Sequence, residues 1–290
     1  MVHGGLQEGG KPVDDTACLW LWDVEQASWG RARPATAADK SPAPRSNHEI
    51  FVNEKQNWAV IHGGVIADSK ADGTETWLFD FETASWTELP SLPHTTLGSA
   101  LVGTTLQTIS QDSNLGGSIH SLDITTAAIK NKQLSWTKTD FPTNQLVPGP
   151  QLNNGGSTLP LTTGYGRYYL LHLLGSPEKA TDSTSDKPAA RQGAPNSALW
   201  ALQLPSENIS ASHLKDVIRD AIPIVNSGKS TLSEIEITYK GSENPSGRPD
   251  PGQRNFFAAD TFPDGKRVLL CGGVSSEGQV ENDAWIVSFT

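Results

Sequence analysis

The most constraining feature of this sequence is an internal duplication. The segment LWLWDVEQASW at 19–29 recurs as TWLFDFETASW at 76–86, and a Gly-Gly pair preceded by histidine comes before each, at 3–5 and at 62–64. Self-similar segments rich in aromatic and β-branched residues are typical of repeat folds built from short antiparallel strands. The duplication therefore predicts one all-β repeat architecture along the chain.

Strand-like segments recur through the rest of the sequence, and alignment on the Gly-Gly pair gives five units of approximate bounds 1–34, 35–92, 93–142, 143–240 and 241–290. The strand after each pair carries an anchor, and the anchors are Trp20, Trp77, His120, Trp200 and Trp285. A flat ring at a repeated position suits the packing of one small sheet on the next. We expect positive φ at the paired glycines, where the backbone turns sharply. We also expect the carboxylates of Asp23 and Asp80 to accept backbone N–H groups in tight turns.

The order Gly-Gly, Trp-x-x-Asp and a second Trp six residues after the Asp resembles the kelch repeat. The match is strongest in the first two units and good around Trp285, whereas 108–110 and 174–175 stand where the pair is expected in units 3 and 4. The resemblance implies a kelch-type β-propeller of four-stranded antiparallel blades, as a single domain over 1–290. It further implies a six-bladed ring in a complete protein.

Both ends depart from the pattern, because unit 1 has no room for its innermost strands and unit 5 ends before an outer strand. Kelch rings usually close by letting one terminus complete the blade of the other, which removes exposed sheet edges. We favour a shortened N-terminus over an open ring or an unconventional closure.

Unit 4 is long, and two inserted segments, a loop and a helix, account for its length. Residues 176–195 are rich in Ser, Thr, Asp, Lys and Pro, which predicts a mobile loop. Residues 209–222 predict a helix whose apolar face consists of Leu214, Val217, Ile218, Ala221 and Ile222. This face either covers an apolar blade edge or contacts a partner. The alternating segment 233–239 predicts the outer strand that follows.

Charge and composition narrow the class of partner. The formal net charge is −10, so a nucleic-acid backbone or an anionic lipid surface would be repelled. The sequence shows neither a secretory signal nor a membrane span, and we expect a soluble, cytoplasmic protein. Cys18 and Cys271 both lie in strand-like segments, so buried reduced thiols are expected instead of a disulfide framework.

Candidate binding residues come from the segments that we assign to the innermost strands and their approaches. They are Arg45, Asn47, His48, His94, Gln151, Asn153, Arg254 and Asn255. Around the mouth of a central channel such side chains suit a carboxylate, a phenol or a polar peptide. The alternative is that Arg45 and His48 are structural residues of the kelch motif Pro-Arg-x-x-His and bond to the adjacent blade.

A metal site is the other candidate. Plant specifier proteins are kelch propellers with an iron site patterned Glu-x-x-x-Asp-x-x-x-His, and this chain has Glu178, Asp182 and Asp186 at that spacing, with Asp in place of His. Fe(II) sites usually include imidazole, so a solvated acidic loop is the competing interpretation. Galactose oxidase also carries a kelch-like propeller, but neither cysteine has the setting of its copper site. We expect no cofactor, with a divalent metal at this triad as the exception.

These features predict a kelch-type binding module that engages a protein partner through loops on one face. The alternative is a small-molecule enzyme of specialised metabolism, cyclase-like or specifier-like, with its site at the channel mouth. Expected partners are thus a protein or a small molecule, without nucleic acid or membrane. No nucleophile elbow, zinc-protease, P-loop or dinucleotide motif occurs.

Overall fold

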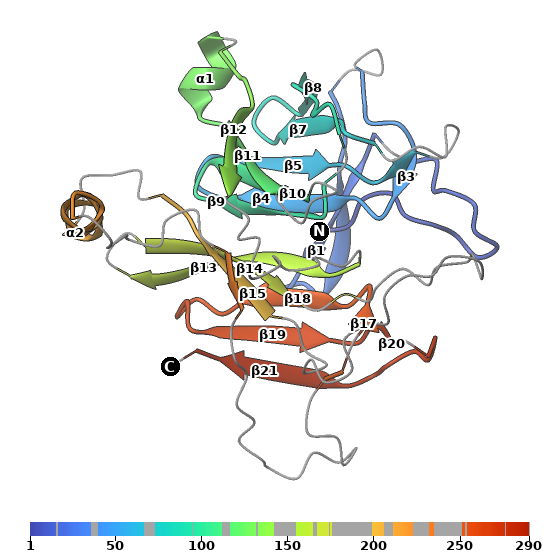
Figure 1. Ribbon diagram of the computed structural model, residues 1–290. Coiled ribbons are helices and arrows are strands. Elements are labelled where there is room, and N and C mark those ends of the chain that lie inside the picture. The colour runs from blue at the N-terminus through green and yellow to red at the C-terminus, as the bar shows by residue number, and fades with distance from the viewer. Residues whose placement is uncertain are drawn as a thin grey trace, which may run out of the picture. The chain divides into compact units, whose positions relative to one another are not determined.

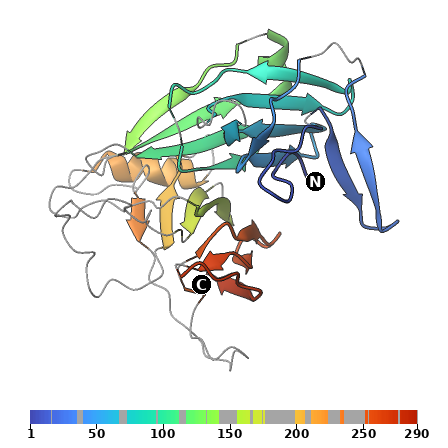
Figure 2. The ribbon, with the colours of Figure 1, turned by 90° about the vertical axis from the view of Figure 1, so that its right-hand side faces the viewer.

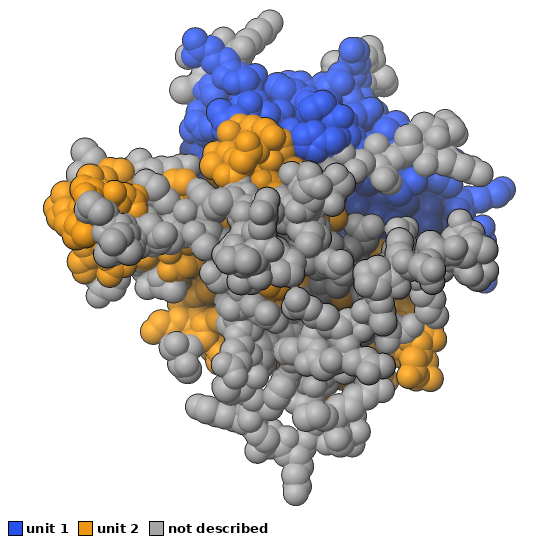
Figure 3. All heavy atoms as spheres, in the orientation of Figure 1, with its two compact units in different colours: residues 1–96, 103–106, 121–137 blue, residues 97–102, 107–120, 138–290 orange. Residues whose placement is uncertain are grey.

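The computed structural model describes residues 1–15, 17–35, 40–66, 73–94, 96–111, 117–131, 133–141, 155–164, 167–173, 175, 199–205, 211–222, 232–234, 251–252, 254–275 and 277–289 (Figure 1). The chain forms two compact units, coloured separately in Figure 3. Unit 1 comprises Met1–Thr96, Gly103–Leu106 and Ser121–Thr137, and unit 2 comprises Leu97–Val102, Gln107–His120 and Lys138–Thr290. Both units are built from antiparallel sheets, which confirms the all-β prediction.

Unit 1 contains the duplicated segments, each as a β-hairpin. Sheet 1 consists of β1 (Leu19–Asp23) and β2 (Ser28–Ala32). Sheet 2 has the order β4-β5-β7-β8, with β4 (Glu49–Asn53), β5 (Trp58–His62), β7 (Thr76–Asp80) and β8 (Ser85–Leu89). A short pair of strands flanks β4 and β5 in the chain: β3 (Arg45–Ser46) precedes them and β6 (Val65–Ile66) follows them. Figure 2 shows the strands of sheet 2 side by side.

Sheet 3 has the order β12-β11-β10-β9 and contributes residues to both units. Its strands are β9 (Gly98–Val102), β10 (Thr105–Gln111), β11 (Gly117–Asp123) and β12 (Thr137–Phe141). The six-residue helix α1 (Thr126–Asn131) occupies the connection between β11 and β12. Thr125 Oγ1 accepts a hydrogen bond from the backbone N–H of Ala128 at its start.

Unit 2 contains the two remaining main sheets. Sheet 4 has the order β13-β14-β15-β16, with β13 (Ser157–Gly164), β14 (Arg167–Leu173), β15 (Leu199–Gln203) and β16 (Leu232–Glu234). Helix α2 (Ala211–Asp220) lies between β15 and β16 in the chain. Sheet 5 consists of β18 (Ala258–Thr261), β19 (Arg267–Cys271) and β21 (Ala284–Ser288), and the short pair β17 (Arg254–Asn255) and β20 (Val274–Ser275) accompanies it.

We call the face of a sheet that carries the anchor side chain the anchor face, and the other the opposite face. In the two pairs below, the opposite face of one sheet packs on the anchor face of the sheet that follows or precedes it in the chain. In unit 1, Leu19 on the opposite face of sheet 1 joins one buried cluster with Trp77, Phe79 and Trp86 on the anchor face of sheet 2. In unit 2, Leu171 on the opposite face of sheet 4 clusters with Leu270 and Trp285 on the anchor face of sheet 5.

The local predictions are largely confirmed. Asp23 Oδ1 accepts hydrogen bonds from two backbone N–H groups at 2.9 Å each, and Asp80 Oδ1 accepts the equivalent pair at 2.8 and 3.1 Å. The glycines of all three clear pairs have positive φ. A Cβ on Gly64 would lie 2.6 Å from the carbonyl oxygen of Ser46, so the tight approach demands glycine there.

Several expectations need correction or extension. The predicted helix 209–222 is observed as Ala211–Asp220, and α1 was not expected. Cys18 is buried as expected, whereas Cys271 is partly exposed. The described part of segment 233–239 is its first two residues, which belong to β16. The loop at 176–195 lies outside the described residues. Among those residues, neither helix approaches the length and hydrophobicity of a membrane span.

Candidate binding surface

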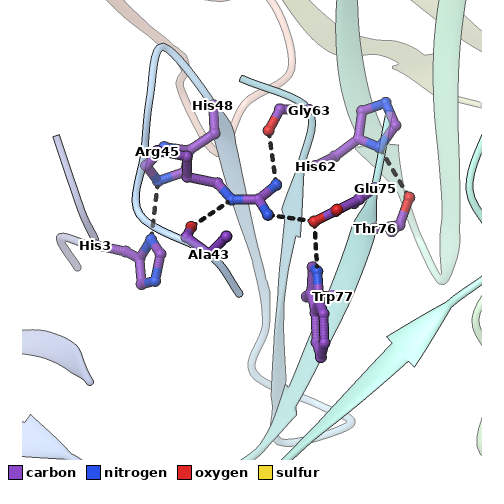
Figure 4. Close-up of polar contacts among 9 residues, drawn as sticks. All are labelled: His3, Ala43, Arg45, His48, His62, Gly63, Glu75, Thr76 and Trp77. Carbon is purple, nitrogen blue, oxygen red and sulfur yellow. Dashed lines mark hydrogen bonds and ion pairs between the residues drawn. The ribbon is translucent and has the colours of Figure 1, made fainter. Parts of the chain in front are cut away.

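Arg45 occupies a closed polar cluster in unit 1, drawn in Figure 4. Its side chain is fully buried. The guanidinium donates to the carbonyl oxygens of Ala43 at 3.1 Å and Gly63 at 3.0 Å, and pairs with the carboxylate of Glu75 at 2.5 Å. Trp77 Nε1 donates to the same carboxylate oxygen at 3.1 Å. Arg45 thereby links the turn at Gly63 to Glu75, and Glu75 in turn binds the anchor Trp77.

Unit 2 repeats this cluster around Arg254. This side chain is also fully buried, and it donates to the carbonyl oxygens of Pro251 and of Gly272, the latter at 2.9 Å. Its carboxylate partner is Asp283, at 2.5 Å, and Trp285 Nε1 donates to Asp283 at 2.8 Å. Two independent repeats have thus reached the same arrangement of arginine, carboxylate and tryptophan.

The two carboxylates are held ionised by these contacts. Partial burial pushes the pKa of Glu75 up, but hydrogen bonds from Arg45 and Trp77 outweigh it and hold the pKa below its ordinary value. The hydrogen bond from Arg254 lowers the pKa of Asp283 against the effect of burial, and Trp285 adds to the lowering. Both carboxylates are therefore ionised near neutral pH.

Histidines surround the Arg45 cluster (Figure 4). His3 Nδ1 lies 3.2 Å from His48 Nε2, and His62 Nδ1 lies 2.9 Å from Thr76 Oγ1. Burial, together with the charges of His3 and Arg45, lowers the pKa of His48 to about 4. Burial and the charge of Arg45 lower the pKa of His62 to about 4 as well. These two rings are neutral at pH 7 and act as hydrogen-bonding groups within the fold.

The predicted binding residues that the structure describes belong to two different compact units. Arg45, Asn47 and His48 form one local group in unit 1, where Asn47 is exposed with a φ of 55°. His94 is half-buried in the same unit. Arg254 and Asn255 form the other group, in unit 2, and Asn255 pairs with Val274 across β17 and β20.

The remaining candidates have no structural test. Gln151 and Asn153, and the acidic triad Glu178, Asp182 and Asp186, lie outside the described residues. Among the residues that are described, no three His, Cys, Asp or Glu side chains gather closely enough to hold a metal ion. The interpretation as a small-molecule enzyme gains no support from the described part of the chain.

Helix α2 exposes its apolar face. From the sequence, this face could either cover an apolar blade edge or contact a partner. Its apolar residues Leu214, Val217 and Ile218, with Ile222 just beyond its end, are 61%, 50%, 54% and 48% exposed. We call these four residues the α2 stripe. On a helix of 3.6 residues per turn, Asp216 lies nearly opposite Ile218.

An ion pair fixes this orientation of α2. Asp216 is buried and bonds to Arg167, the first residue of β14, so the polar side of the helix faces the protein. Figure 1 shows α2 near the end of β13 and the start of β14. The ion pair therefore holds the helix by its polar side and leaves the α2 stripe in solvent.

Basic residues flank the α2 stripe on one side. Lys215 and Arg219 are exposed and one helical turn apart, next to Leu214 and Ile218. This local positive charge stands on a chain whose formal net charge is −10. The surface combines an apolar centre with a basic edge, which suits an apolar partner with acidic flanks.

Comparisons with known proteins give limited similarity. No protein-family model matches the chain. A segment of 70 residues is 34% identical to Tip elongation aberrant protein 3 of Schizosaccharomyces pombe, a kelch-repeat protein. The matched segment is 24% of this chain and only 6% of that protein's length. The similarity and the antiparallel sheets fit a kelch-like fold.

Proposed function

We propose that this protein is a kelch-like binding module that engages a protein partner through the α2 stripe. The observation that carries the proposal is the inverted orientation of α2, whose polar Asp216 is buried while four apolar side chains are exposed. A surface helix normally turns its apolar face to the core. Exposing that face costs hydrophobic free energy, and a partner that covers it recovers this energy.

The chemistry of the surface defines the partner. The α2 stripe offers aliphatic side chains at helical spacing, as in grooves and helices that bind an amphipathic segment. Lys215 and Arg219 favour a carboxylate beside the apolar contact. We therefore infer a protein partner that presents apolar side chains flanked by Asp or Glu. The limited similarity to a kelch-repeat protein is compatible with this scaffold role.

The predicted residues around a channel mouth remain a separate prediction. The guanidinium groups of Arg45 and Arg254 are buried and engaged in their own clusters, so these two side chains support the structural alternative. Asn47, His48, His94 and Asn255 are at least partly exposed. The proposal for partner binding concerns the α2 stripe and not these residues.

Photo-crosslinking identifies the partner directly. A photoreactive amino acid replaces Ile218 in the full chain, and a second variant carries it at Val280, which is 82% exposed outside the α2 stripe. Both variants are irradiated in extract of the native host. The partner is the protein captured from position 218 and not from position 280.

Binding of the purified partner then tests the proposal. Leu214→Asp with Ile218→Asp should weaken the affinity by ~30-fold or more, as expected for loss of central apolar contacts. Val280→Asp is the matched control and should bind as the parent chain does. Equal affinities for all three proteins, measured by titration calorimetry, would refute a role for the α2 stripe.

A further inference from the structure

Sheet 3 departs from the other repeats at the positions that form the two arginine clusters. In both clusters the anchor is tryptophan, and the carboxylate that it contacts stands two positions before it. In sheet 3 the anchor is His120, and the residue two positions before it is Ser118. Ser110 ends the segment that stands where the Gly-Gly pair is expected. A repeat that replaces several structural residues at once is a candidate for a separate function.

These replacements bring a serine hydroxyl and an imidazole together. Ser110 Oγ lies 3.0 Å from His120 Nε2, across the neighbouring strands β10 and β11, and both residues belong to unit 2. In the tautomer protonated on Nδ1, Nε2 accepts the hydrogen bond from the hydroxyl. At this distance an imidazole is placed to take the hydroxyl proton as a general base. His120 is buried, whereas Ser110 is partly exposed, so the nucleophilic atom belongs to the more accessible residue of the pair.

The face around this pair is polar. Ile109 of β10 and Ile119 of β11 belong to one buried apolar cluster. Side chains alternate along a strand, so their sequence neighbours lie on the other face of the sheet: Thr108, Ser110, Ser118 and His120. Thr108 Oγ1 is buried and has no hydrogen-bond partner among the residues that the structure describes. A buried hydroxyl normally has a partner, so this face retains an unused donor two residues from Ser110.

Two other pairs of histidine and hydroxyl provide an internal comparison. His62 Nδ1 lies 2.9 Å from Thr76 Oγ1, and His172 Nδ1 lies 3.0 Å from Thr158 Oγ1. All four of these side chains are buried. A molecule from solvent therefore does not reach these hydroxyls, and the two pairs support the fold. Ser110 differs from both threonines because it is partly exposed and because its hydroxyl is primary.

A carboxylate flanks the pair on β12. Asp140 Oδ1 accepts a hydrogen bond from Ser118 Oγ at 2.7 Å and pairs with Lys138 Nζ at 2.8 Å. The hydrogen bonds from Lys138 and Ser118 lower the pKa of Asp140, and the charge of His120 adds to the lowering. The ionised carboxylate favours the imidazolium that forms when His120 takes a proton, although Lys138 offsets part of its charge.

We propose that Ser110 is a nucleophilic serine, activated by His120, that accepts an acyl group from an activated ester. Ser110 Oγ bonds to the carbonyl carbon of the ester while its hydroxyl proton passes to His120 Nε2. The bond from that carbon to the leaving oxygen breaks, and the leaving group departs with the electron pair as an alkoxide or phenolate. His120 then gives the proton to the leaving group or to water. This acylation does not depend on the α2 stripe and does not require turnover.

Covalent labelling of the unmodified full chain tests the nucleophile. A fluorophosphonate reacts with an activated serine and leaves a stable ester, because Oγ bonds to phosphorus and fluoride departs. Peptide mass spectrometry should place the label on Ser110. Ser28, which is exposed in the β1–β2 hairpin, is the internal control and should stay unlabelled. Absence of label on Ser110, or equal labelling of Ser28, would overturn the proposal.

A variant of His120 tests the base. His120→Gln keeps a group that can hydrogen-bond to Ser110 but cannot take its proton. Labelling of Ser110 should therefore be slower by ~100-fold, within the range that a general base contributes. His213→Gln, a change at a histidine of α2, is the matched control and should label as the parent chain does. The same rate for His120→Gln and the parent would overturn the role of His120.

Release of p-nitrophenolate from p-nitrophenyl acetate tests acyl transfer itself. The parent chain should release it at least ~10-fold faster than Ser110→Ala, in which the nucleophile is missing. Equal rates would show that Ser110 accepts no acyl group.

The pH dependence of labelling keeps the role of His120 testable if His120→Gln does not fold. The labelling rate of Ser110 in the parent chain should rise with pH and then level off, because an imidazole is fully available as a base once it is neutral. Attack assisted by hydroxide alone would continue to rise about tenfold per pH unit. A rate that never levels off would therefore overturn activation by His120.

Discussion

At the scale of single residues, two buried arginines hold equivalent clusters in different units. Arg45→Met and Arg254→Met should each lower the free energy of unfolding by about 3 kcal/mol, because Glu75 or Asp283 would lose the cation that balances it. Unfolding in urea followed by tryptophan fluorescence measures the change. Arg31→Met is the control, since its ion pair with Asp15 is exposed and 3.8 Å long. It should cost under about 1 kcal/mol, and equal costs for all three changes would contradict the structural role.

His62 predicts how stability depends on pH. Its pKa is about 4 in the folded chain and about 6.5 when unfolded, so the unfolded state binds the proton first as pH falls. The contribution of His62 to stability is thus complete above about pH 6.5 and is lost between there and about pH 4. Between pH 7.5 and pH 5 the loss amounts to about 2 kcal/mol.

His62→Gln tests this dependence, because the amide keeps a group that can bond to Thr76 but does not titrate. The free energy of unfolding, measured at intervals from pH 7.5 to pH 5, should fall less steeply for the variant. Curves that stay parallel for the two proteins would show that His62 does not titrate as the structure indicates.

The sequence identified these residues but not their partners. Arg45 and His48 stood out by the motif Pro-Arg-x-x-His, and their structural role was one of two alternatives. Glu75 was not predicted to pair with Arg45, since 30 positions separate them and only the folded turn brings them together. The available signal was an acidic residue two positions before the anchor tryptophan, at Glu75 and again at Asp283.

At the scale of elements, the Arg167–Asp216 ion pair joins α2 to β14 of sheet 4. Asp216→Asn should speed backbone hydrogen exchange throughout α2, because the helix is too short to be stable without docking. Mass spectrometry of peptic fragments measures the exchange. Lys215→Gln, a change at the exposed neighbour, is the matched control and should leave the exchange of α2 as it is. Unchanged exchange in Asp216→Asn would mean that other contacts hold the helix.

Elements were predictable where one segment carries its own signal. The strands of sheets 1, 2 and 5 could be predicted from the Gly-Gly pair and the anchor residue, and α2 could be predicted from its apolar periodicity. The side of α2 that faces solvent was not predictable, because it depends on Asp216 meeting Arg167, 49 positions earlier. Helix α1 was missed because a helix of six residues offers too few turns for a periodic pattern.

At the scale of the whole molecule, the sequence predicted an all-β fold of antiparallel sheets, because its segments repeat the same local signals. It could not predict which sheet faces would remain uncovered. Trp22 and Phe79 have nearly the same sequence surroundings and opposite exposures, since exposure depends on the neighbouring sheet. The repeated local signals therefore predict strands and turns, but not which sheet faces become covered.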